Sequence, residues 1–354
     1  MIHILKTILL YPLSIIYGCI TFCRNKLYDQ NIFNSTAFNL PVISVGNLSL
    51  GGTGKTPHIE YLIRLLSPTN KIATLSRGYK RKTSGFIIGN KNSTIEQIGD
   101  EPLQYFLKFE KIVVAVDEKR VNGIEKIRYH HPELSAILLD DAFQHRAVSP
   151  GLNILITEYN QLYCDDLVIP AGRLREWPTG SDRANLIIVS KSPRALSIIE
   201  REKTIHALQP KKHQSVYFSF VQYGKLVAFT KKAKAILSLD KINTDIILLT
   251  GIAKPTPLIK KLSKDYNSLQ HIKYSDHHSF TISDIKHIAA AYEQLNSNNK
   301  IIITTEKDIM RLSLPSILNE IPDIPIFYIP IEICFHGNDK KEFDRKILDY
   351  VGTN

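Results

Sequence analysis

The chain has 354 residues, of which 44% are hydrophobic and 22% charged, and its formal net charge at pH 7 is +11. This composition excludes a disordered chain and a polytopic membrane protein, and the length predicts two domains. The positive charge suits a polyanionic partner such as nucleotide phosphates, nucleic acid or an anionic membrane surface. Because the sequence has no zinc-finger spacing or RNA-binding aromatic signature, we expect no nucleic acid partner. The four cysteines form no CxxC pair, which favours a reducing cytoplasm over a disulfide framework or a zinc site.

The amino-terminal segment is apolar. Between Lys6 and Arg24 no residue carries a formal charge. As a helix this stretch would be about 25 Å long, slightly shorter than the roughly 30 Å hydrocarbon core of a bilayer. We predict that residues 1–29 form a membrane-anchoring apolar helix, which lies in the interface or barely spans the membrane. A buried hydrophobic helix is the alternative.

Short apolar runs alternate with helical patterns over residues 30–215. PVISVGN (41–47) and SAILLDD (135–141) are typical of buried strands, and the pattern from Lys55 to Leu66 predicts a helix. Continuous apolar strands with helical crossovers predict an α/β fold with a parallel sheet covered by helices on both faces. The other strands predicted here are 71–77, 111–117, 152–158 and 185–191.

A second α/β pattern follows. The runs SVYFSF and KLVAF predict a β-hairpin, which we assign to a linker over residues 216–232. Residues 233–354 are then predicted to form a smaller α/β domain, with DIILLTGI and KIIITTEKD as strands. Thr281 and Asp284 form a capping-box pattern ahead of an amphipathic helix. The late strand IPIFYIPIEICF is expected to return to the hairpin.

The strongest local signal is a glycine-rich loop, VGNLSLGGTGKTP (45–57), between a predicted strand and a predicted helix. This is the context of a phosphate-binding loop, since glycines let the backbone wrap around phosphates and the helix N-terminus supplies positive potential. Lys55 is expected to reach the β- and γ-phosphates, and Thr56 to bind Mg²⁺. The predicted ATP-binding residues are Ser49, Leu50, Gly51, Gly52, Thr53, Gly54, Lys55 and Thr56.

The loop departs from the G-x-x-x-x-G-K-[ST] pattern at Ser49, where that pattern has glycine. A glycine-rich turn that binds no phosphate is the alternative, although Gly-Gly-x-Gly-Lys-Thr rarely arises from packing alone. A GTP-binding protein would carry an N-K-x-D-like guanine-reading motif after a late strand. The nearest segment, Ser190 to Pro193, lacks the aspartate, which favours ATP.

A second signal is AILLDDAFQH (136–145), a buried strand that ends in two acids. Ligands of α/β sheets bind at the carboxyl ends of strands, so Asp140 or Asp141 could hold Mg²⁺ directly or through water. The alternative is a pair of acids that only caps the end of a strand.

Together these motifs resemble one family, the tetraacyldisaccharide 4'-kinases, which are the lipid A 4'-kinases of Gram-negative bacteria. The resemblance runs from the apolar amino-terminal segment to roughly residue 335. Many NTPases share the phosphate loop, whereas GDEP, DDxFQH and PAGxLRE in this order are far more specific. Two departures, Ala142 in place of glycine and Ser275 in place of proline, remove no reacting group. The motifs are GNLSLGGTGKTP, LSRGYKRK (75–82), GDEP (99–102), LDDAFQHR (139–146), PAGRLRE (170–176), TGIAKP (250–255), SDHHSF (275–280) and TTEKD (304–308).

The resemblance implies the reaction. The γ-phosphoryl of ATP–Mg²⁺ would be transferred to the 4'-hydroxyl of a tetraacylated glucosamine disaccharide 1-phosphate, a step of lipid A biosynthesis. This substrate is held in the inner membrane and faces the cytoplasm, so the resemblance places the protein at that surface. The apolar segment, the phosphate loop and the positive charge agree with an anionic membrane surface as partner, and no protein partner is indicated.

The resemblance also implies roles for particular side chains. Asp100 becomes the candidate base and His277 its partner, with His278 as the alternative histidine. From the residues alone, Asp100 is better explained as an acid at a helix N-terminus, and the histidine pair as surface polar groups.

The remaining roles concern charged residues. A basic run after a strand is usually a solvated face, but here it could bind the substrate's 1-phosphate or headgroups, and arginine suits phosphate contacts. Lys307 and Asp308 are expected to be structural. The candidate metal ligands are Thr56, Glu101, Asp140, Asp141 and Glu176. The candidate substrate-binding residues are Arg77, Arg81, His145, Arg173 and Arg175.

Two other classes of protein compete with a kinase. Membrane-associated regulatory ATPases of the partition or metallochaperone kind also use Gly-Gly-x-Gly-Lys-Thr, but often carry a lysine just before the glycine pair, where this chain has Leu50. A catalytically dead membrane scaffold is disfavoured by the intact Lys55, Thr56, Asp140 and Asp141.

Overall fold

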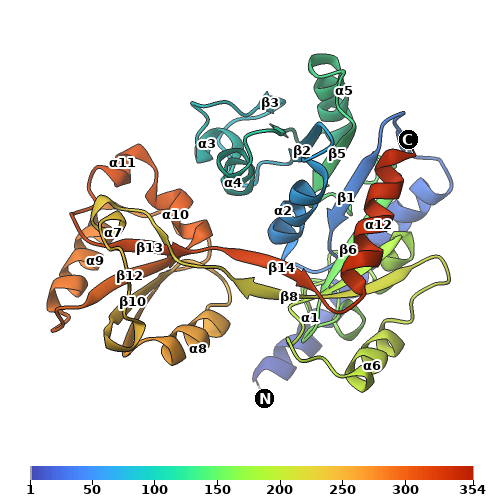
Figure 1. Ribbon diagram of the computed structural model, residues 1–354. Helices are drawn as coiled ribbons and strands as arrows, with labels where there is room; N and C mark the ends of the chain where they lie inside the picture. Colours follow the sequence, from blue (N-terminus) through green and yellow to red (C-terminus); the bar gives the residue numbers. More distant parts are fainter. Residues whose placement is uncertain (1, 354) are drawn as a thin grey trace. The chain divides into compact units, whose positions relative to one another are not determined.

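A computed structural model describes residues 2–353, and these residues form two compact units (Figure 1). The first unit comprises the chain up to Val221 together with the segment from Ile333 onward, and the second is Gln222–Glu332. Each unit has its own β-sheet and its own hydrophobic core. The chain therefore leaves the first unit once and returns to it.

The first unit is built on a nine-stranded sheet with the order β14-β8-β7-β6-β1-β5-β2-β4-β3. The pairs from β8 to β4 are parallel, and β3 pairs with β4 in the antiparallel direction. The predicted parallel sheet is thus confirmed. Its strands are β1 Val42–Gly46, β2 Ile72–Ser76, β3 Ile87–Ile88, β4 Val113–Val116, β5 Ala136–Asp140, β6 Leu152–Glu158, β7 Leu186–Ser190, β8 Ser215–Tyr223 and β14 Ile331–Phe335.

Helices cover both faces of this sheet because its buried strands are apolar at every position. Successive residues of a strand point to opposite faces. Ile43 and Val45 of β1 accordingly pack with α2, α4 and α12, whereas Val42 packs with α5 on the other face. The helical segments of this unit are α1 Ile2–Asp29, α2 Lys55–Leu66, α3 Ile95–Ile98, α4 Asp100–Lys108, α5 Arg120–His130, η1 Tyr163–Asp165, η2 Pro178–Arg183, α6 Ile198–Leu208 and α12 Asp339–Gly352.

The second unit has a five-stranded sheet with the order β11-β10-β12-β13-β9. It is parallel except for β9, which runs antiparallel to β13. The predicted capping box is confirmed, because the Thr281 side chain accepts from the Asp284 N–H at the start of α9. The elements are β9 Val227–Ala228, α7 Lys231–Lys234, η3 Lys241–Asn243, β10 Asp245–Thr250, α8 Thr256–Asp265, β11 Ser268–Lys273, α9 Ile282–Gln294, β12 Lys300–Thr305, α10 Glu306–Leu312, α11 Pro315–Leu318 and β13 Ile326–Ile329.

The predicted hairpin over 216–232 is wrong. β8 pairs with β7 in the nine-stranded sheet, whereas β9 pairs with β13 in the five-stranded sheet. The predicted late strand is also divided between the sheets at Pro330, because proline lacks the N–H that a strand ladder requires. The segment from Ile333 onward therefore belongs to the first unit rather than to a domain over 233–354.

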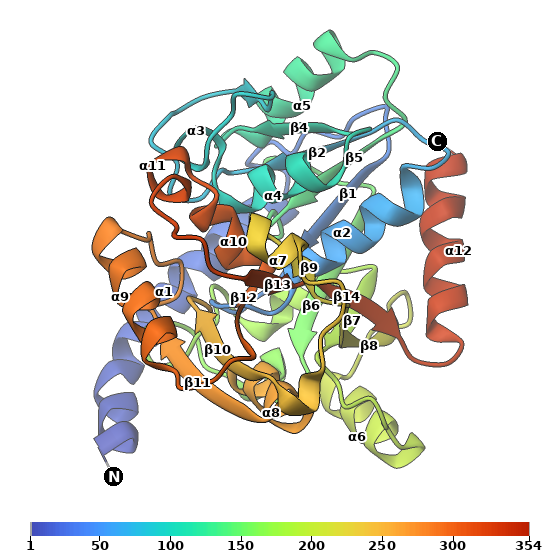
Figure 2. The same cartoon turned by 60° about the vertical axis from the view of Figure 1, so that its left-hand side comes forward.

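Helix α1 has an unusual distribution of side chains. Its small and polar residues, including Ser14 and Gly18, are buried, whereas Leu9, Ile16 and Ile20 are exposed by 77%, 58% and 63%. The alternative of a buried hydrophobic helix is therefore wrong. The amino-terminal end of α1 extends away from the nine-stranded sheet in both views (Figures 1 and 2).

Over residues 2–353, no helix combines the length and the hydropathy that crossing a membrane requires. The spanning form of the predicted anchor is therefore not supported. Polar side chains such as Ser14, Thr21 and Asn25 interrupt the apolar sequence of α1 once per turn along its buried side.

Candidate active site

The glycine-rich loop joins β1 to α2, as its sequence predicts. Gly51 and Gly54 have φ values of 105° and 97°, which side chains other than glycine rarely adopt. The fully buried Asn47 donates from Nδ2 to the Ser49 carbonyl at 2.7 Å and to Thr53 Oγ1 at 2.9 Å. Asn47 thus spans the loop from inside and fixes its curvature.

Lys55 is the first residue of α2 and lies beside the end of β5. Its Nζ is 3.3 Å from Asn47 Oδ1 and 3.6 Å from Asp141 Oδ1. β1 and β5 are paired neighbours, with Val45 opposite Asp140, so the two motifs found in the sequence meet at one edge of the sheet. The expected union of phosphate loop and paired acids is therefore present in the fold.

Asp140 is a buried carboxylate in an unfavourable environment. Burial, together with the negative charges of Glu101 and Asp141, raises its pKa to about 6. The Tyr105 hydroxyl donates to Asp140 Oδ2 at 3.0 Å, and Lys55 also favours the ionised form, but neither outweighs burial and repulsion. The site therefore concentrates more negative charge than its own residues neutralise.

Asp141 follows directly but is stabilised as a carboxylate. Its partly buried position opposes ionisation, yet the charges of Lys55 and Arg175 outweigh this and hold its pKa below the ordinary value. Arg175 binds it with both ends of the guanidinium, at 2.9 Å and 3.1 Å. The φ of 50° at Asp141 turns its side chain away from the strand direction.

The PAGRLRE segment runs against the phosphate loop. The Leu50 N–H donates to the Arg173 carbonyl and the Arg175 N–H to the Leu48 carbonyl, each at 2.7 Å. The Arg173 side chain is held by Asp166, with Nε 3.0 Å from Oδ2. This pairing places both predicted arginines beside the loop, and Arg175 is the one directed at the acids.

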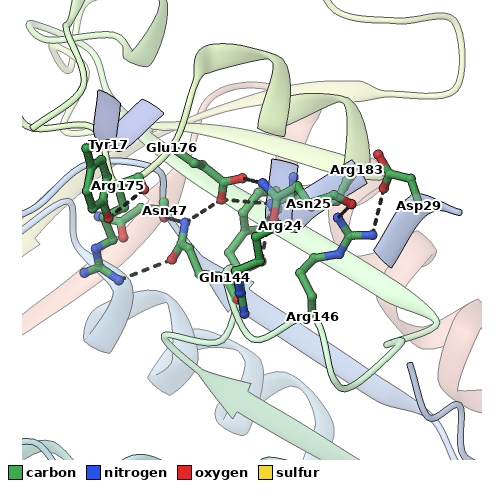
Figure 3. A network of polar contacts seen from close by, with 11 residues as sticks. Tyr17, Arg24, Asn25, Asp29, Asn47, Gln144, Arg146, Arg175, Glu176 and Arg183 are labelled. Atoms are coloured by element: carbon green, nitrogen blue, oxygen red, sulfur yellow. Dashed lines mark hydrogen bonds and ion pairs between the residues drawn. The ribbon is translucent and has the colours of Figure 1, made fainter. Parts of the chain in front are cut away.

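Glu176 lies at the centre of a polar network (Figure 3). Its side chain is buried and accepts hydrogen bonds from Asn25 at 2.6 Å, Arg183 at 2.9 Å and Gln144 at 3.0 Å. Gln144 also donates to the Asn47 carbonyl at 2.9 Å. Because these N–H groups occupy the carboxylate oxygens, we assign Glu176 to joining α1 to the phosphate loop, instead of the metal-ligand role predicted from the sequence.

The same network ties α1 to the unit at other points (Figure 3). The Tyr17 hydroxyl donates to the Arg175 carbonyl at 3.1 Å, and Arg146 Nη2 lies 2.8 Å from Asp29 Oδ1. Gly18 lies so close to Trp177 that an added Cβ would come within 2.5 Å of the indole ring. The buried side of α1 is therefore a specific docking surface for the segment that borders the phosphate loop.

The three other predicted substrate residues differ in exposure. Arg77 is exposed, whereas the Arg81 side chain is buried in an ion pair with Glu118, so we assign Arg81 to holding its own loop. His145 accepts the Arg120 N–H at Nε2. Burial and the neighbouring arginine lower the pKa of His145 to about 4, so its imidazole is neutral at pH 7.

The GDEP motif places two acids in the first turn of α4. A Cβ at Gly99, which has a φ of 91°, would meet the Gly78 backbone at 3.2 Å, so glycine lets this turn pack against the RGYK segment. Asp100 begins the helix, and the charge of the next residue, Glu101, contributes to the raised pKa of Asp140. The GDEP turn is thus electrostatically coupled to the acids beside the phosphate loop.

In the second unit, His277 has a defined orientation. Its φ is 58°, and its Nδ1 lies 3.1 Å from Arg311 Nη2. Arginine can only donate, so Nδ1 accepts and the proton of the neutral ring is on Nε2. Arg311 is held at 3.1 Å by the buried Asp308, which also accepts the Gly251 N–H at 3.0 Å. Asp308, expected to be structural, thus orients the arginine that orients His277.

His278 has a different environment. Its Nε2 lies 3.0 Å from Asp284, the capping acid of α9, and its ring stacks on Tyr274 with 4.5 Å between centroids. These contacts explain His278 as part of the helix cap. The preference for His277 over its neighbour gains support, while its pairing with Asp100 stays a prediction.

Three residues of the site were not predicted: Asn47, Tyr105 and Gln144. Two of them stand inside motifs that were recognised, GNLSLGGTGKTP and LDDAFQHR, so a search for polar side chains within each motif would have found them. Tyr105 carried no such signal, because its contact with Asp140 depends on how α4 packs on the sheet.

A strand–loop–helix phosphate site, with its lysine beside two acids on the neighbouring strand, defines a phosphoryl-transfer enzyme of the P-loop class. The family model described as tetraacyldisaccharide-1-P 4'-kinase matches residues 6–352. The chain belongs to the tetraacyldisaccharide 4'-kinase family and is an ATP-dependent kinase, so the regulatory ATPase alternative is not favoured.

Relatives and one solved structure agree with this assignment. The tetraacyldisaccharide 4'-kinase of Flavobacterium psychrophilum is 47% identical over 98% of this chain and 97% of its own length. That of Phocaeicola vulgatus is 43% identical over 98% of this chain and 95% of its own. A crystal structure of LpxK from Aquifex aeolicus in complex with ATP shares the fold, with a TM-score of 0.68 at 24% identity, and covers 96% of this chain and 98% of its own.

Proposed function

We propose that this kinase transfers the γ-phosphoryl of ATP to the 4'-hydroxyl of a tetraacylated glucosamine disaccharide 1-phosphate, a step of lipid A biosynthesis. The observation that carries the proposal is the placement of Lys55 between the phosphate loop and Asp141, in a chain of this family. Lys55 is oriented by Asn47 and Asp141 before any nucleotide binds, so it can stabilise charge on the β- and γ-phosphates without reorganisation.

The acids fit a divalent cation. Repulsion from Glu101 and Asp141 contributes to the raised pKa of Asp140, and a cation between the acids and the phosphates would relieve it. In residues 2–353, no cluster of three or more His, Cys, Asp or Glu side chains forms a metal site by itself. We therefore assign Mg²⁺ to Asp140, Asp141 and Thr56 together with phosphate oxygens, where it would neutralise developing charge.

The acceptor hydroxyl needs a group that orients it and takes its proton. We assign this role to Asp100, which begins α4 close to the acids that surround the phosphate loop. His277 is assigned as its partner. Because Arg311 fixes Nδ1 as an acceptor, His277 would act as a neutral donor through Nε2–H. It would then stabilise the Asp100 carboxylate or the hydroxyl by a hydrogen bond.

The substrate's 1-phosphate requires a cation at the mouth of the site. Arg77 is exposed at the end of β2, and a guanidinium can bind phosphate with two hydrogen bonds. Arg173 and Arg175 border the phosphate loop on its other side, where Arg175 also keeps Asp141 ionised. We assign Arg77 to the lipid phosphate and the two loop arginines to the reacting phosphates.

Membrane attachment is assigned to α1 as a helix lying in the interface. Its exposed side chains are apolar, and its buried side is fastened to the PAGRLRE segment by Tyr17 and Asn25. Such a helix buries its apolar face among the acyl chains, while basic residues meet anionic headgroups. This arrangement places the phosphate loop at the cytoplasmic face of the inner membrane, where the lipid substrate is held.

One assay tests the central proposal. Purified protein is incubated with γ-³²P-ATP, Mg²⁺ and disaccharide 1-phosphate in detergent micelles, and the lipid fraction is separated and counted. Transfer of label to the lipid supports the kinase. Hydrolysis of ATP without labelled lipid would contradict it and favour the regulatory ATPase.

A further inference from the structure

Three successive carbonyl groups of the phosphate loop accept hydrogen bonds from side chains outside the loop. Two of the donors stand at the carboxyl end of β7, and the third stands on the first turns of α2. The pairs are Lys191 Nζ with the Gly52 carbonyl at 2.5 Å, Ser190 Oγ with the Thr53 carbonyl at 2.7 Å, and His58 Nδ1 with the Gly54 carbonyl at 2.7 Å.

The histidine is fixed in one tautomer. A carbonyl can only accept, so His58 Nδ1 carries the proton, and Nε2 then accepts from Ser219 Oγ at 2.9 Å. His58 is fully buried, and burial lowers its pKa to about 4, so the ring stays neutral at pH 7. Both ring nitrogens are satisfied, which makes the contact with Gly54 a defined feature of the fold.

The two donors on β7 are fixed as well. Ser190 is buried, and its hydroxyl also lies 3.1 Å from the Thr157 carbonyl of β6, so the oxygen sits between a strand and the loop. Lys191 has a φ of 55°, and its Nζ is 3.6 Å from Glu158. Each donor therefore has a second contact that limits its movement.

The geometry of the peptide unit links these contacts to phosphate binding. In a planar trans peptide the C=O of one residue and the N–H of the next point in opposite directions. Holding the Thr53 and Gly54 carbonyls behind the loop turns the N–H groups of Gly54 and Lys55 toward its open side. Those N–H groups are the ones that a phosphate loop offers to its ligand.

A loop with three glycines has many alternative backbone conformations, and each must be abandoned when the nucleotide binds. Donors that hold the loop in the binding shape beforehand reduce this cost. We propose that His58, Ser190 and Lys191 are positioning residues that hold the phosphate loop in its ATP-binding conformation by hydrogen bonds to its outer carbonyls. This role extends beyond the chemistry assigned above, because it depends on nucleotide binding and not on the lipid.

Two substitutions of His58 test the proposal. His58→Leu keeps an apolar side chain of similar size but removes both hydrogen bonds, whereas His58→Asn keeps an amide N–H near the position of Nδ1. We expect His58→Leu to raise the dissociation constant of ADP–Mg²⁺, measured by titration calorimetry, about tenfold, equivalent to about 1.4 kcal/mol. The KM for ATP should rise in parallel, the KM for the lipid should stay within about twofold, and His58→Asn should recover most of the affinity.

A matched set at Ser190 separates loop positioning from general stability. Ser190→Ala removes the hydroxyl and Ser190→Thr keeps it. Thr204→Val on α6 removes another buried hydroxyl, which donates to the Glu200 carbonyl at 2.8 Å but has no printed contact with the loop. All are expected to lower the midpoint of thermal unfolding slightly, but only Ser190→Ala should weaken ADP binding.

The outcomes are decisive in either direction. If folded His58→Leu and Ser190→Ala bind ADP within twofold of the wild type, the three side chains stabilise the fold without positioning the loop, and the proposal is wrong. Should His58→Leu fail to fold, the Ser190 pair decides alone. Loss of lipid phosphorylation with unchanged ADP affinity would instead count against the assignment of Asp100 and His277.

Discussion

Asp140 and Asp141 are adjacent in the chain, yet the protein sets their ionisation in opposite directions. Burial and like charges oppose a second carboxylate at Asp140, whereas Lys55 and Arg175 stabilise the one at Asp141. Lys55 favours both, but it cannot neutralise the whole cluster. At the scale of single residues, the site is therefore a centre of excess negative charge that stores destabilisation until a cation and phosphates arrive.

Replacing Lys55 tests the cation of this cluster. Lys55→Ala should reduce transfer about 10²-fold or more with the fold intact, because no other side chain of α2 can neutralise charge on the phosphates there. The measurement is the rate of label transfer at saturating ATP, with circular dichroism to check folding. Lys203→Ala on the exposed face of α6 is the control and should be unaffected. More than about a tenth of the wild-type rate, a loss below 1.4 kcal/mol, would contradict the assignment.

Replacing Asp140 tests the stored destabilisation. The pKa of Asp140 rises from 3.8 to about 6 on folding, so ionisation costs stability. Below about pH 4 the carboxyl is protonated in both states and nothing is lost; the cost grows between about pH 4 and 6 and is complete above pH 6. Asp140→Asn should therefore raise the free energy of unfolding of the metal-free protein at pH 8 by up to about 3 kcal/mol, while abolishing transfer.

Urea unfolding of both proteins at pH 8 and pH 5 measures this difference. The gain from the substitution should shrink at pH 5, where the wild-type carboxyl is largely protonated. Equal gains at the two pH values would show that the effect comes from packing and not from charge. Addition of ADP–Mg²⁺ should stabilise the wild type more than the variant.

At the scale of elements, local sequence determined more than pairing did. Helix α2 begins at Lys55 and ends at Leu66, as predicted, because its apolar spacing and the preceding glycines act within a few residues. The strand β8 was also found, but its predicted partner was wrong. Which strand a segment pairs with depends on tertiary packing, and β8 finds its neighbours in β7 and in β14, more than a hundred residues later.

The same limit applies to Glu176. Its charge and its place in PAGRLRE made it a reasonable metal ligand, but its donors come from α1, from the loop after β5 and from η2. No spacing in the sequence reveals that these segments converge. Helix α1 was likewise found from composition, while the side that it buries was not, because burial depends on the surface against which it docks.

The exposed side of α1 yields a prediction at this scale. Replacing Leu13, Ile16 and Ile20 with serine removes apolar surface that is open to solvent, without touching the contacts of Tyr17 and Asn25. Binding to vesicles of phosphatidylethanolamine with a quarter phosphatidylglycerol, measured by sedimentation, should weaken at least tenfold. The KM for lipid presented in vesicles should rise, and the KM for ATP should not.

A control on another helix makes this test specific. Tyr129 of α5 is 84% exposed, so Tyr129→Ser removes a comparable apolar surface elsewhere on the same unit. Its vesicle binding should match that of the wild type. If the triple α1 variant sediments with vesicles as well as Tyr129→Ser does, α1 is not the membrane-binding element.

At the scale of the whole molecule, the residues assigned to catalysis are divided between two units. Asp100 and the phosphate loop belong to the first unit, and His277, oriented by Arg311 and Asp308, belongs to the second. Two chain segments connect the units, and the Gly224 N–H donates to the Pro330 carbonyl at 2.9 Å where they run together. A reaction that needs both residues would therefore depend on the relative position of the units, and could be made conditional on both substrates.

A double-mutant cycle tests whether Asp100 and His277 act together. A carboxylate with an ordinary pKa near 4 is a weak base for a sugar hydroxyl, so it needs a partner that orients the reacting groups. Asp100→Ala and His277→Ala should each lower kcat about 10²-fold or more, and the double variant should lose far less than the product of the two. ADP affinity should stay within about twofold, because neither side chain belongs to the phosphate loop. His278→Ala is the matched control; it breaks the contact with Asp284 and should lower thermal stability without a comparable loss of kcat. Fully multiplicative losses would show that Asp100 and His277 work separately, and a large loss of kcat in His278→Ala alone would move the catalytic role to the neighbouring histidine.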